Sequence, residues 1–201
     1  MSHLRSCVVA MVLALALDPA YAASALCPAV PSPSCREAPT AKLKLNRGST
    51  PDRDKIRWSW RNKAGTTFAD FGDPTVGTSY ALCVYDGSAA AQPVLSADAP
   101  AHSECTFEEC WEVYAANTVY LFVDGRHAVS ALSQLKLKSP PGGTNLQARG
   151  GGVLLGRPAL PFTLPVRVQL RNSDTATCWE SNFSSASRND AQIFKATIAE
   201  R

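Results

Sequence analysis

Short runs of alternating apolar and polar residues recur along the chain, and this period of two is typical of β-strands that are buried on one face. The clearest runs are Lys-Leu-Lys-Leu at 42–45, Ile-Arg-Trp-Ser-Trp at 56–60 and Leu-Pro-Val-Arg-Val-Gln-Leu at 164–170. In each run the apolar side chains lie on one face of the predicted strand, and the charged or polar ones lie on the other. The turn-rich segment 46–52 separates the first two runs, so we predict an antiparallel pair.

The run at 80–85 is apolar on both faces and ends at Asp86-Gly87, which predicts a central strand followed by a turn. Pro165 predicts that the run at 164–170 is an edge strand or begins at this residue, because proline donates no hydrogen bond to a ladder. Further short runs lie at 94–97, 119–123, 132–138, 153–155, 178–183 and 193–198. About nine or ten short strands favour an all-β fold, which we predict to be an antiparallel β-sandwich or, alternatively, a barrel.

The first 22 residues have the three parts of a secretory signal peptide. A short basic start precedes the apolar run Cys7–Leu17, and Ala20-Tyr21-Ala22 has the small-x-small pattern of a cleavage site. The apolar run is shorter than the roughly 20 residues that span a bilayer as a helix. We therefore predict cleavage after Ala22 and a bacterial-type protein that is secreted or periplasmic, with no integral membrane segment in the mature chain.

Composition suggests how the mature chain is organised. Residues 23–40 are rich in Pro, Ala and Ser without a strand or helix period, so we expect an N-terminal arm. Residues 41–201 are expected to form a single β domain, since this length and an apolar content of 45% suit one hydrophobic core. The net charge is only +3, and no run of lysines and arginines exceeds two residues, so we expect no nucleic-acid partner.

Six cysteines remain after the predicted cleavage: Cys27, Cys35, Cys83, Cys105, Cys110 and Cys178. An even number in an exported chain favours disulfide bonds over reduced thiols. Many pairings are possible; we expect Cys27–Cys35 and Cys105–Cys110 as local loops and Cys83–Cys178 as a long-range bond. A zinc site at Cys105, Cys110 and the nearby His102 is the alternative use, although no second pair of matching spacing accompanies them.

Catalytic signatures are mostly missing from the sequence, which has no G-x-S-x-G, H-E-x-x-H or kinase motif. Asp124 and His127 are close in sequence, but Asp-Gly is first of all a turn signal, so a surface loop is favoured over a Ser–His–Asp site. Paired acids for glycoside hydrolysis could come from Glu108, Glu109, Glu112 or Glu180. Nothing selects any two of these four, so no catalytic residue is predicted.

Two other groups are candidates for binding. Asp70 and Asp73 lie on one predicted loop and could contribute to a calcium site, although capping of tight turns is favoured and no cofactor is otherwise predicted. Exposed tryptophans could stack on sugar rings, which makes Trp58, Trp111 and Trp179 a possible binding surface. Burial in the core is favoured for these side chains, because a buried tryptophan beside a disulfide is common in β-sandwiches.

Several motifs follow one another with a fairly specific order and spacing, including D-F-G-D-P-T at 70–75, Y-A-L-C-V-Y-D at 80–86, L-P-V-R-V-Q-L at 164–170 and C-W-E-S-N-F at 178–183. This succession resembles a recurring domain of uncharacterised secreted bacterial proteins over nearly all of residues 41–197. The cysteines at 83, 105, 110 and 178 match its pattern, whereas those at 27 and 35 are additional. The resemblance implies export and the fold, and it implies no activity.

These observations favour a non-catalytic secreted or cell-surface domain that binds a protein or a glycan. One alternative is an extracellular hydrolase whose site is assembled from loops, and another is a structural component of the cell envelope. A deep cleft with converging acids, or a serine and a histidine within hydrogen-bond reach, would favour the hydrolase. A flat sheet face with exposed Trp58 or Trp111 would favour the binding domain.

Overall fold

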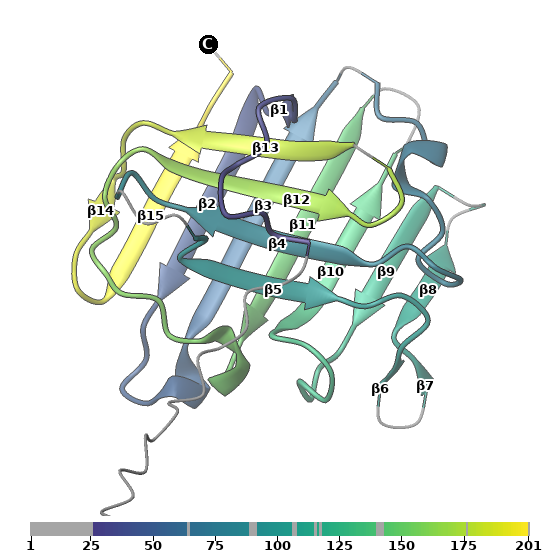
Figure 1. Cartoon of the computed structure of the whole chain (residues 1–201), viewed down its shortest axis with the longest axis horizontal. Helices are drawn as coiled ribbons and strands as arrows, with labels where there is room; N and C mark the ends of the chain where they lie inside the picture. The colour runs from purple at the N-terminus through teal and green to yellow at the C-terminus, as the bar shows by residue number, and fades with distance from the viewer. Residues whose placement is uncertain are drawn as a thin grey trace, which may run out of the picture.

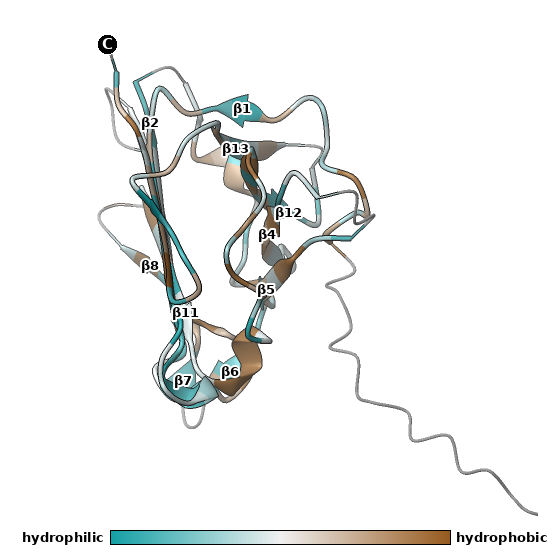
Figure 2. Cartoon of the chain, turned by 90° about the vertical axis from the view of Figure 1, so that its left-hand side faces the viewer, coloured by the Kyte–Doolittle hydropathy of each residue, from teal (hydrophilic) through white to brown (hydrophobic). Residues whose placement is uncertain are grey.

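Two β-sheets lie face to face in the computed structural model, which describes residues 26–63, 65–88, 92–105, 108–114, 116, 118–139, 143–175 and 177–200 (Figures 1 and 2). The strands of the front sheet cross over those of the back sheet in Figure 1. The sheets are not closed into a barrel, so the predicted β-sandwich is confirmed. Within the described residues, no helix is long and apolar enough to span a membrane.

The front sheet has five strands in the order β1-β13-β12-β4-β5. Their bounds are β1 Arg36–Glu37, β4 Tyr80–Tyr85, β5 Leu95–Ala99, β12 Val166–Asn172 and β13 Cys178–Phe183. Only the pairing of β1 with β13 is parallel among these strands. Strand β4 lies between β12 and β5, which confirms the prediction that the doubly apolar run 80–85 is a central strand.

The back sheet has eight antiparallel strands in the order β14-β15-β2-β3-β11-β10-β9-β8. Their bounds are β2 Thr40–Asn46, β3 Lys55–Asn62, β8 Trp111–Tyr114, β9 Val119–Val123, β10 Leu132–Lys138, β11 Thr144–Gly151, β14 Arg188–Asn189 and β15 Ile193–Ile198. Strands β6 Glu104–Cys105 and β7 Glu108–Glu109 form a small separate hairpin. The short 3-10 helices are η1 Pro51–Arg53, η2 Ala69–Phe71 and η3 Val153–Leu155.

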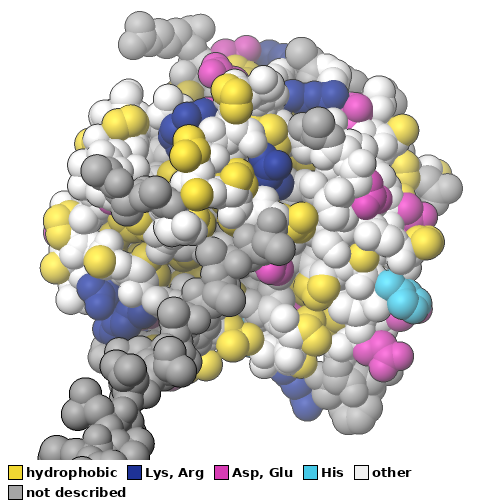
Figure 3. Space-filling model, in the orientation of Figure 1, with side chains coloured by type: hydrophobic (Ala, Val, Ile, Leu, Met, Phe, Trp, Pro, Cys, Tyr) yellow, Lys and Arg dark blue, Asp and Glu magenta, His cyan; other side chains and the backbone are white. Residues whose placement is uncertain are grey.

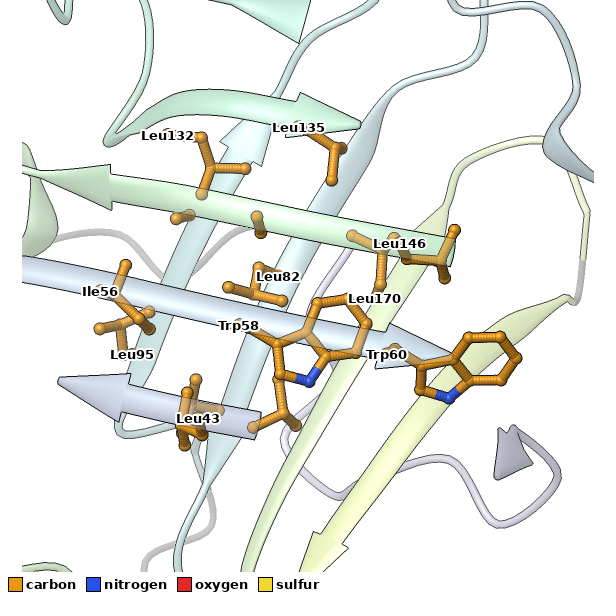
Figure 4. Packing of buried hydrophobic residues seen from close by; sticks show 14 of the residues in the cluster. Leu43, Ile56, Trp58, Trp60, Leu82, Leu95, Leu132, Leu135, Leu146 and Leu170 are labelled. Atoms are coloured by element: carbon orange, nitrogen blue, oxygen red, sulfur yellow. The ribbon is translucent and has the colours of Figure 1, made fainter. Parts of the chain in front are cut away.

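The hydrophobic core fills the space between the two sheets. Figure 4 shows Leu43 and Ile56 of the eight-stranded sheet and Leu82 of the five-stranded sheet within one apolar cluster. Trp58 and Trp60 also point into this cluster from β3, and their indole N–H groups donate to Ser181 Oγ at 3.1 Å and to the carbonyl of Glu180 at 3.0 Å. Because both indoles keep a hydrogen bond, their burial leaves no polar group unpaired.

The strand predicted at 153–155 is wrong, and so is the edge-strand alternative predicted from Pro165. The other alternative, that the strand begins at Pro165, misses its start by one residue. The run 153–155 forms η3, and the strand lies just before it as β11, which ends in Gly150 and Gly151. A Cβ atom at Gly151 would lie 2.3 Å from the carbonyl oxygen of Asp54, so glycine lets β11 approach the neighbouring backbone. Pro165 precedes β12, which is an interior strand, so the missing amide hydrogen removes no ladder bond.

The described part of the predicted arm, residues 26–39, crosses the outer face of the five-stranded sheet. Disulfides join Cys27 to Cys83 of β4 and Cys35 to Cys178 of β13, so the expected pairs Cys27–Cys35 and Cys83–Cys178 are wrong. Strand β12 separates the strands of Cys83 and Cys178, which places these residues about two strand spacings apart, beyond the reach of a disulfide. The expected Cys105–Cys110 bond is confirmed. The predicted signal peptide, 1–22, lies outside the described residues.

Candidate functional site

The outer face of the eight-stranded sheet carries an unusual concentration of positive charge. Strands β15, β2, β3, β11 and β10 contain nine of the chain's 20 lysines and arginines and none of its 17 acidic residues. We call these nine residues the basic face: Lys42, Lys44, Lys55, Arg57, Arg61, Lys136, Lys138, Arg149 and Lys195. Cations that form no run in the sequence are therefore gathered on one face by the fold.

Strand alternation places these cations on one side. In β2, Ala41, Leu43 and Leu45 are buried in the core, and Lys42 and Lys44, which alternate with them, are exposed. The same alternation in β3 buries its isoleucine and two tryptophans and exposes its lysine and two arginines. Since each buried apolar residue forces its neighbours to the opposite side, the core pattern itself projects the positive charges outward.

The register of the strands then aligns cations from four different strands. Lys195 of β15 lies directly opposite Lys44 of β2, and Lys44 lies opposite Arg57 of β3. Arg57 in turn lies opposite Arg149 of β11. We call these four residues the basic row, which at strand spacings of about 4.8 Å is about 14 Å long. Like charges directly opposite one another destabilise a sheet, and a locally unfavourable arrangement of this kind is typical of functional sites.

The basic face has no acidic partners of its own. No member forms an ion pair with a described residue, whereas arginines elsewhere do: Arg167 lies 2.7 Å from Glu180 and Arg36 lies 3.0 Å from Asp70. The opposite side of the molecule, seen in Figure 3, shows lysines and arginines in small groups separated by side chains of other kinds. Unpaired cations in adjacent rows make the basic face the strongest electrostatic feature of the described surface.

The basic face is also hollowed. A central hollow of about 340 Å³ lies over the basic row and is lined by uncharged polar residues as well, among them Ser59, Gln147 and Thr197. A hollow of about 450 Å³ adjoins it at Arg61, and one of about 220 Å³ adjoins it at Arg57 and Arg149. We call the three adjoining hollows the trough.

Acidic residues lie only at the two ends of the trough, among the residues described. Glu200 at one end lies 3.7 Å from Lys63, which is outside the basic face. Asp52 and Asp54 lie at the other end. Asp54 is buried, accepts a hydrogen bond from the amide of Gly48 at 2.7 Å and lies 3.9 Å from Arg157. Its carboxylate therefore already has partners within the fold. No described acidic residue lines the centre of the trough. Its cations and uncharged polar residues lie beside the core residues Leu43, Trp58, Ala148 and Ala196.

The tryptophans proposed as a binding surface are buried. Trp58 and Trp111 are 2% exposed and Trp179 is 0% exposed, so the binding hypothesis is wrong for all three and the favoured core interpretation is confirmed. Trp111 donates to the carbonyl of Pro100 at 2.9 Å, and Trp179 donates to Thr66 Oγ1 at 3.0 Å. Cys178 faces the arm on the outer side of β13, which is why its neighbour Trp179 faces the core.

The aspartates considered for calcium have structural roles. Asp70 accepts two hydrogen bonds from the guanidinium of Arg36, at 3.0 and 3.1 Å, and this contact lowers the pKa of Asp70 to about 2. Asp73 accepts hydrogen bonds from the amide and hydroxyl of Thr75, which caps a tight turn. In the part of the chain that the structure describes, no group of three or more His, Cys, Asp or Glu is placed to hold a metal ion.

The residues considered for zinc and for a catalytic triad also build local structure. The Cys105–Cys110 disulfide leaves neither sulfur as a thiolate ligand for zinc. The buried carboxylate of Asp124 accepts backbone hydrogen bonds from residues 128, 129 and 130 at 2.8–3.0 Å. His127 places Nδ1 3.0 Å from the carbonyl oxygen of Ser130. Asp124 and His127 thus shape the same loop, which agrees with the favoured surface-loop interpretation.

The glutamates considered for hydrolysis divide between two places. Glu180 is buried in β13 and accepts hydrogen bonds from Arg167. A separate hollow of about 330 Å³ beside the Cys105–Cys110 disulfide is lined by Glu108, Glu109 and Glu112. It lies near β8, at the edge of the eight-stranded sheet opposite to the edge near β15. The structure therefore separates Glu180 from the other three.

No protein-family model, curated protein or solved structure matches this chain. The resemblance to a domain of uncharacterised secreted bacterial proteins stays a prediction. The basic face is therefore the main evidence for the function of this chain.

Proposed function

We propose that this chain is a non-catalytic binding domain of an exported protein, secreted or periplasmic, and that its basic face binds anionic polymers. The observation that carries the proposal is the basic row, in which four cations from neighbouring strands lie directly opposite one another without an acidic partner. A polyanion placed across the row would replace repulsion between cations with attraction to the ligand.

The residue types suit such a ligand. The guanidinium groups of Arg57, Arg61 and Arg149 can each donate two parallel hydrogen bonds to a carboxylate, sulfate or phosphate group. The lysines add point charges on flexible stems that adjust to the spacing of the ligand's charges. Each contact is weak alone because the side chains are exposed, but many contacts made by one polymer add up to useful affinity, with a strong dependence on salt.

The three disulfides support the exported location, because such bonds persist in oxidising compartments. The lining of the trough also favours binding over hydrolysis at this site. The trough is lined with cations, whereas acid–base hydrolysis of glycosides needs two facing carboxyl groups.

The proposal is tested by measuring binding to heparin at low and at physiological salt. Lys44→Gln/Arg57→Gln removes two adjacent members of the basic row, and we expect it to weaken binding at least about tenfold. Arg53→Gln/Arg126→Gln is the matched control, since it removes two exposed cations that lie outside the basic face and form no ion pair with any described residue. Equal losses in the two variants, or no binding of the wild type, would contradict the proposal.

A further inference from the structure

We infer that the ligand of the basic face is an extended acidic polysaccharide that lies along the trough, parallel to β3 and β11. This inference rests on the proposed function and adds the class of the polymer and its direction. Three features of the trough point to it: its axis, the order of its side chains and the kinds of side chain that it lacks.

The axis follows from the residues that the hollows share. Arg61 and Asn145 are opposite one another at one end of the trough, Ser59 and Gln147 are opposite in its centre, and Arg57 and Arg149 are opposite toward the other end. The trough therefore follows the β3–β11 pair. The eight residues of β3 extend about 26 Å at about 3.3 Å each, which suits a chain-like ligand lying lengthwise.

The order of side chains matches a polymer that carries both acids and hydroxyl groups. Ser59 and Gln147, which are uncharged, lie between the arginines of the two neighbouring pairs. On the next strand, Lys42 and Lys44 flank the same hollow. Hydroxyl and amide side chains both donate and accept hydrogen bonds, as sugar hydroxyl groups do, whereas the flanking cations suit the carboxylate or sulfate groups of an acidic sugar.

The same surface lacks features that other polyanions use. Proteins that bind single-stranded nucleic acids stack the bases on exposed aromatic side chains, and all four tryptophans of this chain are buried. None of the exposed large hydrophobic side chains lies on the five strands of the basic face, so no apolar group there could enter a membrane.

The first test compares four probes at about 150 mM salt: alginate, neutral dextran, single-stranded DNA with the same number of charges as the alginate, and vesicles of phosphatidylglycerol and phosphatidylcholine. We expect alginate to bind at least about tenfold more tightly than each of the others, with an affinity that rises with oligosaccharide length until the ligand spans the trough. Equal or tighter binding of the DNA or the vesicles would overturn the inference and leave the proposed function standing. Failure of every anionic probe, at low salt as well, would overturn both.

The second test separates the trough from charge alone. Ser59→Ala/Gln147→Ala removes the central neutral groups without changing the charge, and we expect about threefold to tenfold weaker alginate binding. Gln134→Ala is the matched control, because Gln134 lies opposite Arg149 on β10 but does not line the central hollow. Thermal unfolding confirms that each variant is folded. If the double variant retains wild-type alginate affinity, the neutral groups do not contact the ligand and the inference fails.

Discussion

The outer faces of the two sheets differ in their charged residues. The strands of the five-stranded sheet carry three cations and three acids, whereas five strands of the eight-stranded sheet carry nine cations and no acid. The first face is covered by the chain's own N-terminal arm, and the second is open. Charges are thus paired on the sheet face that the chain itself covers. Cations are left without acidic partners on the open face, where a ligand could replace the solvent.

On the covered face, the arm joins a network of polar side chains. Glu180 accepts hydrogen bonds from Arg167 and from Gln169, and Gln169 also donates to the carbonyl of Ser32 in the arm at 2.8 Å. Arg171 donates to the hydroxyl of the same serine. Because Glu180 and Gln169 are buried, each depends on the others for its hydrogen bonds.

The largest loss of stability is expected when Glu180, the buried acid of the covered face, is removed. We expect Glu180→Ala to lower the free energy of unfolding by about 3 kcal/mol, because it leaves one amide hydrogen of Gln169 and part of Arg167 without a partner in a buried site. Urea unfolding measures the change. Glu112→Ala, which removes an exposed acid on β8, is the control and should change stability by less than about 0.5 kcal/mol. Similar values for the two variants would show that the network is not what holds the covered face.

A smaller effect is expected at the Arg36–Asp70 pair beside the arm. The pKa of Asp70 is lowered to about 2, so the pair stabilises the fold above pH 4 and loses its contribution as the pH falls from 4 to 2. Arg36→Ala should cost about 1 kcal/mol at neutral pH, a value reduced by the partial exposure of the arginine, and the cost should vanish toward pH 2. Unfolding curves across this pH range, with Arg53→Ala as the control, test the prediction. A cost that does not depend on pH would exclude the carboxylate as its cause.

The smallest expected change in stability is a gain, whereas the two changes above are losses. Lys44→Glu places an acid between Lys195 and Arg57 and so turns two repulsive cross-strand pairs into attractive ones. We expect the fold to gain about 0.5–1 kcal/mol at low salt, and less in high salt, while polyanion binding weakens. Thermal unfolding at two salt concentrations measures the gain, and Arg126→Glu is the control. A destabilised variant would mean that the basic row causes no strain in the unliganded protein.

The sequence predicted the strands well where at least one face is apolar. Runs 80–85, 119–123, 132–138, 178–183 and 193–198 each match a strand of the structure. It failed at β11, which none of the predicted runs includes, because glycine is disfavoured in strands by propensity. Gly150 and Gly151 are placed there because they allow close approach to the neighbouring backbone. Propensity alone cannot show that a glycine serves a long-range contact.

The basic face was missed for a related reason. A strand that is apolar on one side can place cations only at every second position, so no run of consecutive lysines and arginines appears in the sequence. Counting cations at alternate positions, as at Lys42 and Lys44 or at Lys136 and Lys138, would have indicated one charged side for each strand. The order of the strands depends on long-range pairing, so the alignment of these charged sides required the structure.

The connectivity of the two arm disulfides has a consequence for how the chain matures. Cys27 and Cys35 are close in sequence, whereas Cys35 and its partner Cys178 are separated by 143 residues. In an unfolded chain, loop closure favours the wrong local bond over Cys35–Cys178 by about 2.5 kcal/mol. The correct bonds therefore depend on β4 and β13 folding before the arm is oxidised, and early oxidation is a trap that only thiol–disulfide exchange can reverse. We therefore expect the reduced chain to need a disulfide isomerase as well as an oxidant to reach its native bonds.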